Sequence, residues 1–197
     1  MKKFFTVLAL ASVIAASAQK NGNKPVEFGL KAGVNFSNIR ESGGGVSVSY
    51  SSLTNFVGGA TALYNISNSF GIQGELLYTG SGAKANGDKI VMSYLSIPVL
   101  AKYKVTNSGL GIFAGPQIGF LLSAKDKPSS GSSVDVKNSF KSSDFSGILG
   151  ADYSFKGGFK VDARYQIGLS DISASGAGNS STVKNTGFQI TVGYTFK

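Results

Sequence analysis

The sequence contains no cysteine, no histidine and no tryptophan, and only 4 of its 197 residues are proline. Without cysteine, the fold cannot be held by disulfides or carry a thiolate metal site. The absence of histidine excludes Ser-His-Asp and Cys-His catalysis and imidazole metal ligands. Glycine is abundant instead, with 27 residues, which suits tight turns and closely packed strands.

Long apolar runs are also missing, apart from a short one near the start. Lys2 and Lys3 precede an apolar stretch over residues 4–15, and Ala16-Ser17-Ala18 has the small-residue pattern of a cleavage site. The stretch is too short to span a bilayer. We therefore predict a cleaved signal peptide at residues 1–18, export of the chain, and one β-barrel domain over residues 19–197. No later run approaches 18 apolar residues, so no transmembrane helix is expected.

Acidic side chains are scarce. After removal of the signal peptide, 17 basic and 10 acidic residues leave a net charge of +7. For an exported protein this favours anionic lipid head groups, lipopolysaccharide or polysaccharide as partners over nucleic acid. A merely solvated basic surface is the alternative. The long connections between the alternating segments described below hold Arg40, Lys84, Lys89, Lys125, Lys127, Lys137, Lys141 and Lys184.

Eight segments of about ten residues alternate between apolar and small or polar side chains, as in the closing "GFQITVGYTFK". A period of two indicates a β-strand, because successive side chains point to opposite faces. The connections at 65–69, 106–109 and 156–158 are short, whereas those at 39–54, 80–89, 123–144 and 171–186 are long. This predicts an all-β fold: an eight-stranded antiparallel up-and-down transmembrane β-barrel. The segments are 28–36, 56–65, 70–79, 95–104, 110–122, 145–155, 159–170 and 188–196.

The charges of these segments all fall on the polar face, and aromatic rings gather near the ends of the apolar face. A charged side chain at mid-depth in lipid is costly, and aromatic rings favour the two membrane interfaces. The apolar face is therefore expected outside and the polar face in the lumen, where five bases and three acids pair in a packed core. The predicted lumen network is Lys31, Glu75, Lys102, Lys104, Asp152, Lys160, Asp162 and Arg164.

Four stretches, "FGLKAGVNFSNI", "YLSIPVLAKYKV", "GIFAGPQIGFLLSAK" and "VDARYQIGLSDIS", together resemble the PorT-like outer-membrane β-barrel domain. Small barrels of the OmpX and OmpA type share the general architecture. The resemblance implies an outer-membrane location and contact with periplasmic chaperones and the barrel assembly machinery. Tyr194 and Phe196 match the C-terminal aromatic assembly signal, although Lys197 rather than an aromatic is last. The resemblance does not fix an activity.

Two sets of carboxylates are candidates for catalysis or metal binding. Glu75 with Asp152 or Asp162 could form an acid–base pair, but ion pairing in the lumen explains them more simply. Asp126, Asp135 and Asp144 lack the dense spacing of a calcium loop. We expect no enzyme activity, cofactor or metal.

The chain is therefore expected to be a monomeric lipid-anchored barrel whose four long extracellular loops have a structural or interaction role. A narrow porin-like channel with a mildly cationic lumen is the alternative.

Overall fold

The computed structural model describes residues 26–43, 46–85, 87–174 and 182–196. The predicted signal peptide at 1–18 lies outside them. Within these residues, no helix is long and apolar enough to cross a membrane. The elements are β1 (Val26–Gly43), β2 (Val46–Ser49), β3 (Ser51–Asn65), β4 (Phe70–Ala85), β5 (Asp88–Lys104), β6 (Leu110–Lys127), β7 (Val134–Asp135), the 3-10 turn η1 (Lys137–Ser139), β8 (Ser143–Ser154), β9 (Phe159–Gly168) and β10 (Thr182–Phe196).

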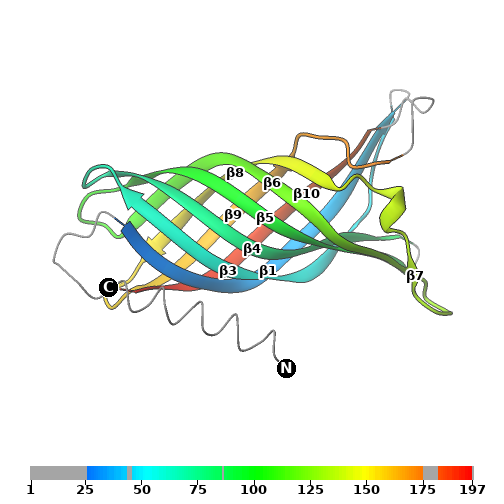
Figure 1. Cartoon of the computed structure of the whole chain (residues 1–197), viewed down its shortest axis with the longest axis horizontal. Coiled ribbons are helices and arrows are strands. Elements are labelled where there is room, and N and C mark those ends of the chain that lie inside the picture. Colours follow the sequence, from blue (N-terminus) through cyan, green and yellow to red (C-terminus); the bar gives the residue numbers. More distant parts are fainter. Residues whose placement is uncertain (1–25, 44–45, 86, 175–181, 197) are drawn as a thin grey trace.

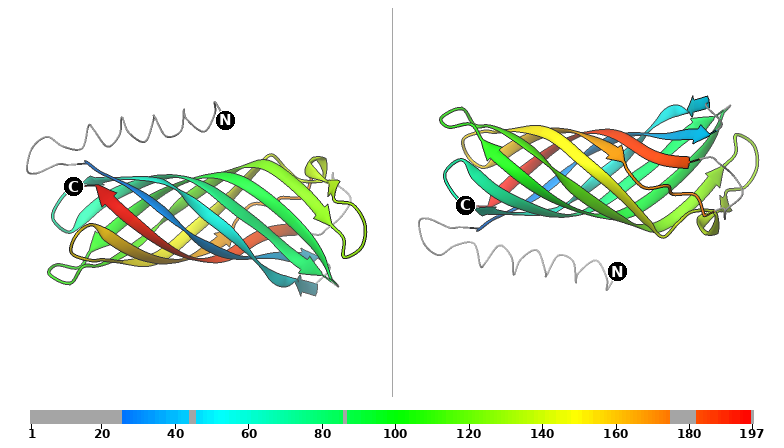
Figure 2. Two further views of the ribbon diagram at one scale, coloured as in Figure 1. Left: turned by 90° about the horizontal axis from the view of Figure 1, so that it is seen from below. Right: turned by 90° about the horizontal axis from the view of Figure 1, so that it is seen from above.

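Eight long strands close into a barrel. Each pairs antiparallel with its neighbour in the order β1, β3, β4, β5, β6, β8, β9, β10, and β10 pairs back onto β1 from Phe28 opposite Phe196 to Ser42 opposite Thr182. Figure 2 shows β10, in red, beside β1, in blue. Closure leaves none of these long strands with an open edge. The predicted eight-stranded antiparallel up-and-down barrel is confirmed.

One end of the barrel carries the short connections and the pairing of Phe28 with Phe196; we call it the turn end. Glycine is required at two of its turns, because Gly109 and Gly158 have φ angles of 74° and 98°. The predicted short connections near 65–69, 106–109 and 156–158 are confirmed. Figure 1 places β7 at the opposite end, which we call the outer end.

The outer end differs from the prediction. The expected long loop at 80–89 is wrong, because β4 and β5 continue through it until Ala85 pairs with Asp88. Much of 39–54 is also strand, formed by the end of β1, β2 and the start of β3. Outward side chains become polar there, for example at Arg40, so the apolar alternation stops while the backbone pairing continues.

The outward face carries a broad belt of exposed apolar side chains. In β1 the belt runs from Leu30 to Phe36, and in β10 from Phe188 to Tyr194. Paired aromatic rings mark the turn end, such as Phe70 against Tyr103 with ring centroids 5.0 Å apart. A water-soluble barrel would hide such a surface, whereas lipid is its natural solvent.

The interior is less polar than predicted. It holds the expected polar residues, but inward-facing apolar side chains are packed among them. The alternation hid these residues because their neighbours on the outward face are also apolar. The largest of them in the middle of the barrel are Val57, Leu63, Leu77, Leu100, Phe113 and Ile148.

Candidate functional site: the barrel interior and its outer end

A buried guanidinium lies at the centre of the lumen. Arg164 of β9 donates from Nη1 and Nη2 to the two carboxylate oxygens of Glu75 in β4, at 2.8 and 3.0 Å. Its Nε and Nη2 also donate to the two oxygens of Asp162, at 2.9 and 2.6 Å. Arg164 is only 1% exposed. Two acids on different strands therefore share one cation across the barrel.

Three further groups complete this central network. Lys31 Nζ lies 3.5 Å from Glu75 and 3.4 Å from Asp162, which supplies a second positive charge for the two acids. Gln73 Nε2 donates to Glu75 Oε1 at 2.6 Å. The Arg164 guanidinium also lies 4.9 Å from the centroid of the Phe113 ring, a favourable cation–π distance. The network is charge-balanced, which buried ions require.

A second group of charges lies nearer the turn end. Lys102 and Asp152 form a buried ion pair. Glu27 lies 3.9 Å from Lys104 and 3.8 Å from Lys160. Glu27 was missed in the sequence because it precedes the first alternating segment.

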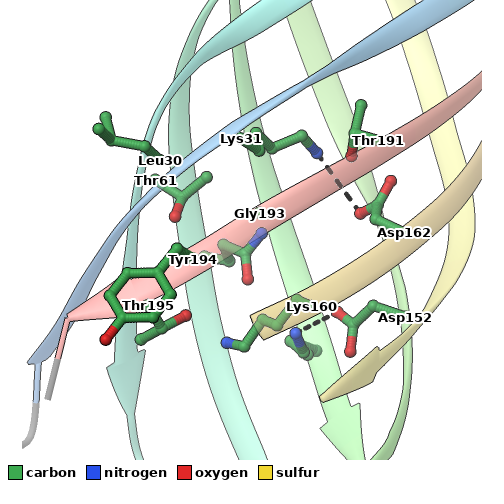
Figure 3. Close-up of a pocket in the computed structure, with 12 residues that line it drawn as sticks. Leu30, Lys31, Thr61, Asp152, Lys160, Asp162, Thr191, Gly193, Tyr194 and Thr195 are labelled. Atoms are coloured by element: carbon green, nitrogen blue, oxygen red, sulfur yellow. Dashed lines mark hydrogen bonds and ion pairs between the residues drawn. The ribbon is translucent and has the colours of Figure 1, made fainter. Parts of the chain in front are cut away.

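A small cavity of about 30 Å³ opens between the two groups. Figure 3 shows Lys31, Asp152, Lys160 and Asp162 around it. This volume is enough for one or a few water molecules only.

The structure therefore places all eight residues of the predicted lumen network on the inside of the barrel. They divide into two groups: Lys31, Glu75, Asp162 and Arg164 in the middle, and Lys102, Lys104, Asp152 and Lys160 toward the turn end, where Glu27 joins them. The polar atoms of Gln189, nearer the outer end, have no hydrogen-bond partner in the described part of the chain.

Most of the carboxylates considered for chemistry are held by structural contacts; Asp126 forms no ion pair within the described residues. Both oxygens of Glu75 accept hydrogen bonds from Arg164. Asp144 accepts from Asn185 and Ser170, and Asp135 accepts from the backbone N–H of Lys137. No group of three or more potential metal ligands occurs in the described ranges. The arrangement is that of an ion-paired core.

The outer end of the lumen is filled by apolar side chains. Ile39, Met92, Ala124 and Ile172 are at most 4% exposed and form one cluster, which we call the apolar plug, with Ala83, Tyr94 and Leu121. Ile172 lies beyond β9 and reaches this cluster because its N–H donates to the Val183 carbonyl of β10 at 2.8 Å. The segment after β9 thus folds inward over the lumen.

Asp171 anchors that segment. Its Oδ1 accepts hydrogen bonds from the N–H groups of Val183 and Ser173, and its Oδ2 lies 3.0 Å from Lys141 Nζ. Partial burial opposes ionisation, but the backbone donors and Lys141 outweigh it and lower the pKa of Asp171 below its ordinary value.

Cations face one another on the outward side of the outer end. Arg40 lies directly opposite Lys184, and Lys89 lies opposite both Lys84 and Lys127. None of these five forms an ion pair with another residue of the described chain. Like charges opposite each other in a sheet repel, so this surface attracts anions.

The residues of the predicted assembly signal lie in β10. Tyr194 faces outward in the apolar belt, where its ring contacts Phe159 and Phe196 at centroid distances of 5.2 and 5.6 Å. Phe196 is half-buried and pairs with Phe28 in the barrel seam.

Comparison with known proteins gives the family. The profile described as outer membrane protein beta-barrel domain matches residues 17–174, and the chain belongs to this family. No curated protein sequence matches the chain. The family and the lipid-facing belt together define an outer-membrane protein.

Two solved structures share the fold. Ail, the attachment invasion locus protein of Yersinia pestis, in complex with the heparin analogue sucrose octasulfate, is 17% identical with a TM-score of 0.50, covering 88% of this chain and 100% of that chain. Neisserial surface protein A is 18% identical with a TM-score of 0.51, covering 88% of this chain and 99% of that chain. At this level of identity the similarity concerns the fold alone.

Proposed function

We propose that the protein is a sealed outer-membrane anchor that presents an interaction surface outside the cell, and not a channel. One observation carries this proposal: buried side chains close the lumen at two levels. The Arg164 network occupies its middle, and the apolar plug occupies its outer end. An eight-stranded barrel has room for little more than its own side chains. The turn end then faces the periplasm and the outer end faces the medium.

The partner that the outer end fits best is an anionic lipid head group of the outer leaflet, such as the phosphates of lipopolysaccharide. The support is the pairing of unneutralised cations, Arg40 with Lys184 and Lys89 with Lys84 and Lys127. A phosphate seated between two opposed ammonium groups relieves their repulsion and forms charge-assisted hydrogen bonds. These cations also lie beyond the apolar belt toward the outer end; in β1, Arg40 follows the belt residue Phe36 by four residues.

Thermal unfolding tests this binding. The protein in phosphatidylcholine nanodiscs is titrated with lipopolysaccharide and with enzymatically dephosphorylated lipopolysaccharide. We expect a higher unfolding midpoint only with the phosphorylated form, because a ligand of the native state stabilises it. Lys89→Gln reduces the gain. Lys156→Gln, an exposed lysine in the turn between β8 and β9, is the matched control and leaves the gain unchanged. An equal gain from both lipids contradicts the proposal.

A narrow channel with a cationic lumen is the second candidate. It is favoured by Lys31, Lys102 and Lys160 around the small cavity and by the unpartnered amide of Gln189. Such a channel requires the apolar plug to move aside, and a conductance measurement separates the two candidates.

The biogenesis proposed from the sequence fits either candidate. The chain is exported by the signal peptide at 1–18, kept soluble by periplasmic chaperones and inserted as a monomer by the barrel assembly machinery through Tyr194 and Phe196. A PorT-like kinship within the family is part of the same proposal. The proposal includes no enzyme activity, because Glu75 and Asp162 in the lumen are held in ion pairs.

A further inference from the structure

A second, larger cavity opens above the apolar plug at the outer end. It has a volume of about 420 Å³, within the range of small-molecule sites. Most of its wall surface is apolar, although this part of the barrel stands beyond the lipid-facing belt and meets water. The lining residues are Ile39, Glu41, Tyr50, Ala83, Lys84, Asp88, Ile90, Asp126, Phe140 and Val183.

The cavity is blind. Ile39 and Ala83 belong both to its lining and to the apolar plug, so the plug forms its floor. Below them, Met92, Ala124 and Ile172 are fully buried and leave no passage into the lumen. A molecule that enters from outside is therefore retained at the mouth and does not pass through. Covering this water-exposed apolar surface with a ligand is favourable, because it removes apolar area from water.

The charged groups that line the cavity indicate which charge a ligand should carry. Three carboxylates, Glu41, Asp88 and Asp126, line it against a single ammonium, that of Lys84. Of the five opposed outward cations, Lys84 alone is part of the lining; Arg40, Lys89, Lys127 and Lys184 are not. The walls therefore have a net negative charge, although the surrounding rim is basic.

These carboxylates are held in different ways. Glu41 Oε2 accepts a hydrogen bond from the Tyr50 hydroxyl at 3.1 Å, and the contact fixes the Tyr50 ring at the wall. Asp88 Oδ1 accepts from the Ser129 N–H at 2.8 Å. Asp126 lies opposite Ile90 across the β5–β6 pair and forms no ion pair within the described chain. It is the carboxylate most available to a ligand.

We propose that this cavity binds a small molecule with an apolar body and one protonated amine. The apolar part covers Ile39, Ile90 and Val183, and the ammonium group pairs with Asp126. The site shares Lys84 with the outward cations, which attract anions, but its carboxylates are separate from them. It requires neither lipid binding nor a sealed lumen. A protein of net positive charge thus carries, at the mouth of its barrel, a site that binds a cation.

Methyl spectra of isoleucine-labelled protein in nanodiscs test the proposal. The probes are 4-phenylbutylamine, 4-phenylbutanol and 4-phenylbutyrate, which share one apolar body and differ in charge. Titration of the Ile39 and Ile90 methyl signals gives the affinity of each probe. We expect the amine to bind at least about tenfold more tightly than the acid, because a charge-assisted hydrogen bond contributes that much to affinity. Ile72 and Ile112 on the lipid face report simple partitioning into the bilayer.

Variants assign the effect to the cavity. Asp126→Asn weakens amine binding about tenfold and leaves binding of the alcohol unchanged. Asp135→Asn is the matched control, because Asp135 lies at the same end and is outside the lining. Val183→Phe fills the cavity and abolishes binding of all three probes. Equal affinity for amine and acid, or equal shifts at Ile72 and Ile39, overturns the proposal, as does an absence of binding.

Discussion

Arg164 and Glu75, 89 residues apart in the sequence, meet in the middle of the barrel as a two-pronged ion pair with N–O distances of 2.8 and 3.0 Å. The pair joins β9 to β4 through the lumen, so it links strands that are not neighbours in the barrel wall. Its side chains have no exposed surface. A contact of this kind holds the two sides of the barrel together and closes the lumen at the same point.

Removal of the Arg164 guanidinium leaves two buried carboxylates, Glu75 and Asp162, with Lys31 as their one remaining cation in this network. We expect Arg164→Ala to lower the free energy of unfolding by about 3–5 kcal/mol, the usual cost of breaking a buried pair. Urea unfolding in lipid vesicles, followed by circular dichroism, measures the loss. Lys141→Ala is the control: it removes a half-exposed pair with Asp171, worth at most about 1 kcal/mol. Both variants still insert. Equal midpoints for the two variants would show that Arg164 is not held as described.

A charge on the belt should block insertion. Val192 is 62% exposed and lies opposite Ala32, midway between Phe28 and Phe36 of β1. Val192→Arg is expected to cost about 2–4 kcal/mol, because arginine is poorly tolerated at mid-depth in lipid. The yield of inserted barrel after refolding into vesicles measures this cost. Val134→Arg is the matched control, since Val134 is 57% exposed but lies in β7, away from the belt. A similar yield from both would contradict the assignment of the faces.

Two glycines of neighbouring strands should respond oppositely to alanine. A Cβ at Gly59 in β3 would strike the backbone carbonyl of Leu76, whereas a Cβ at Gly74 in β4 would meet nothing within 4 Å. We expect Gly59→Ala to destabilise the barrel by about 1–3 kcal/mol through overpacking. Gly74→Ala should be neutral or stabilising by up to about 1 kcal/mol, because alanine restricts the unfolded chain. Urea midpoints compare the two, and the reverse order would count against the packing of β3 on β4.

Acid should loosen the segment after β9. The pKa of Asp171 is lowered in the folded protein, so its contacts stabilise the fold fully above the ordinary carboxyl pKa of 3.8. That contribution is lost as the pH falls through the lower, folded value. The Val183 N–H donates a hydrogen bond to Asp171, so amide hydrogen exchange at Val183 should accelerate only below about pH 4. Asp171→Asn should show fast exchange at neutral pH as well. Acceleration beginning near pH 6 would assign the effect to another group.

The sequence predicts the wall of the barrel better than its contents. Strict alternation identified the membrane-crossing strands and placed Lys31 and Arg164 on the inner face, because lipid excludes charge from the other. It could not predict Phe113 or Leu100 inside, since apolar residues occur on both faces of β5 and β6. Nor could it predict that Glu75 and Asp162 share Arg164, because the stagger of eight tilted strands decides which side chains meet.

The outer end shows a second limit. Beyond the lipid the outward residues are polar, and a paired strand such as the end of β4 has the composition of a loop there. The apolar plug was also not apparent, because Ile172 lies in a segment without alternation and reaches the lumen through a backbone contact with Val183.

Single-channel recording on residues 19–197, refolded in a planar bilayer, tests most directly whether the lumen is sealed. Insertion is established first by protection of the barrel from protease. We expect no stepwise current from the inserted wild-type protein, because the Arg164 network and the apolar plug close the lumen in series. Discrete and reproducible steps from the wild type would contradict a sealed lumen and make the narrow channel the function of the protein.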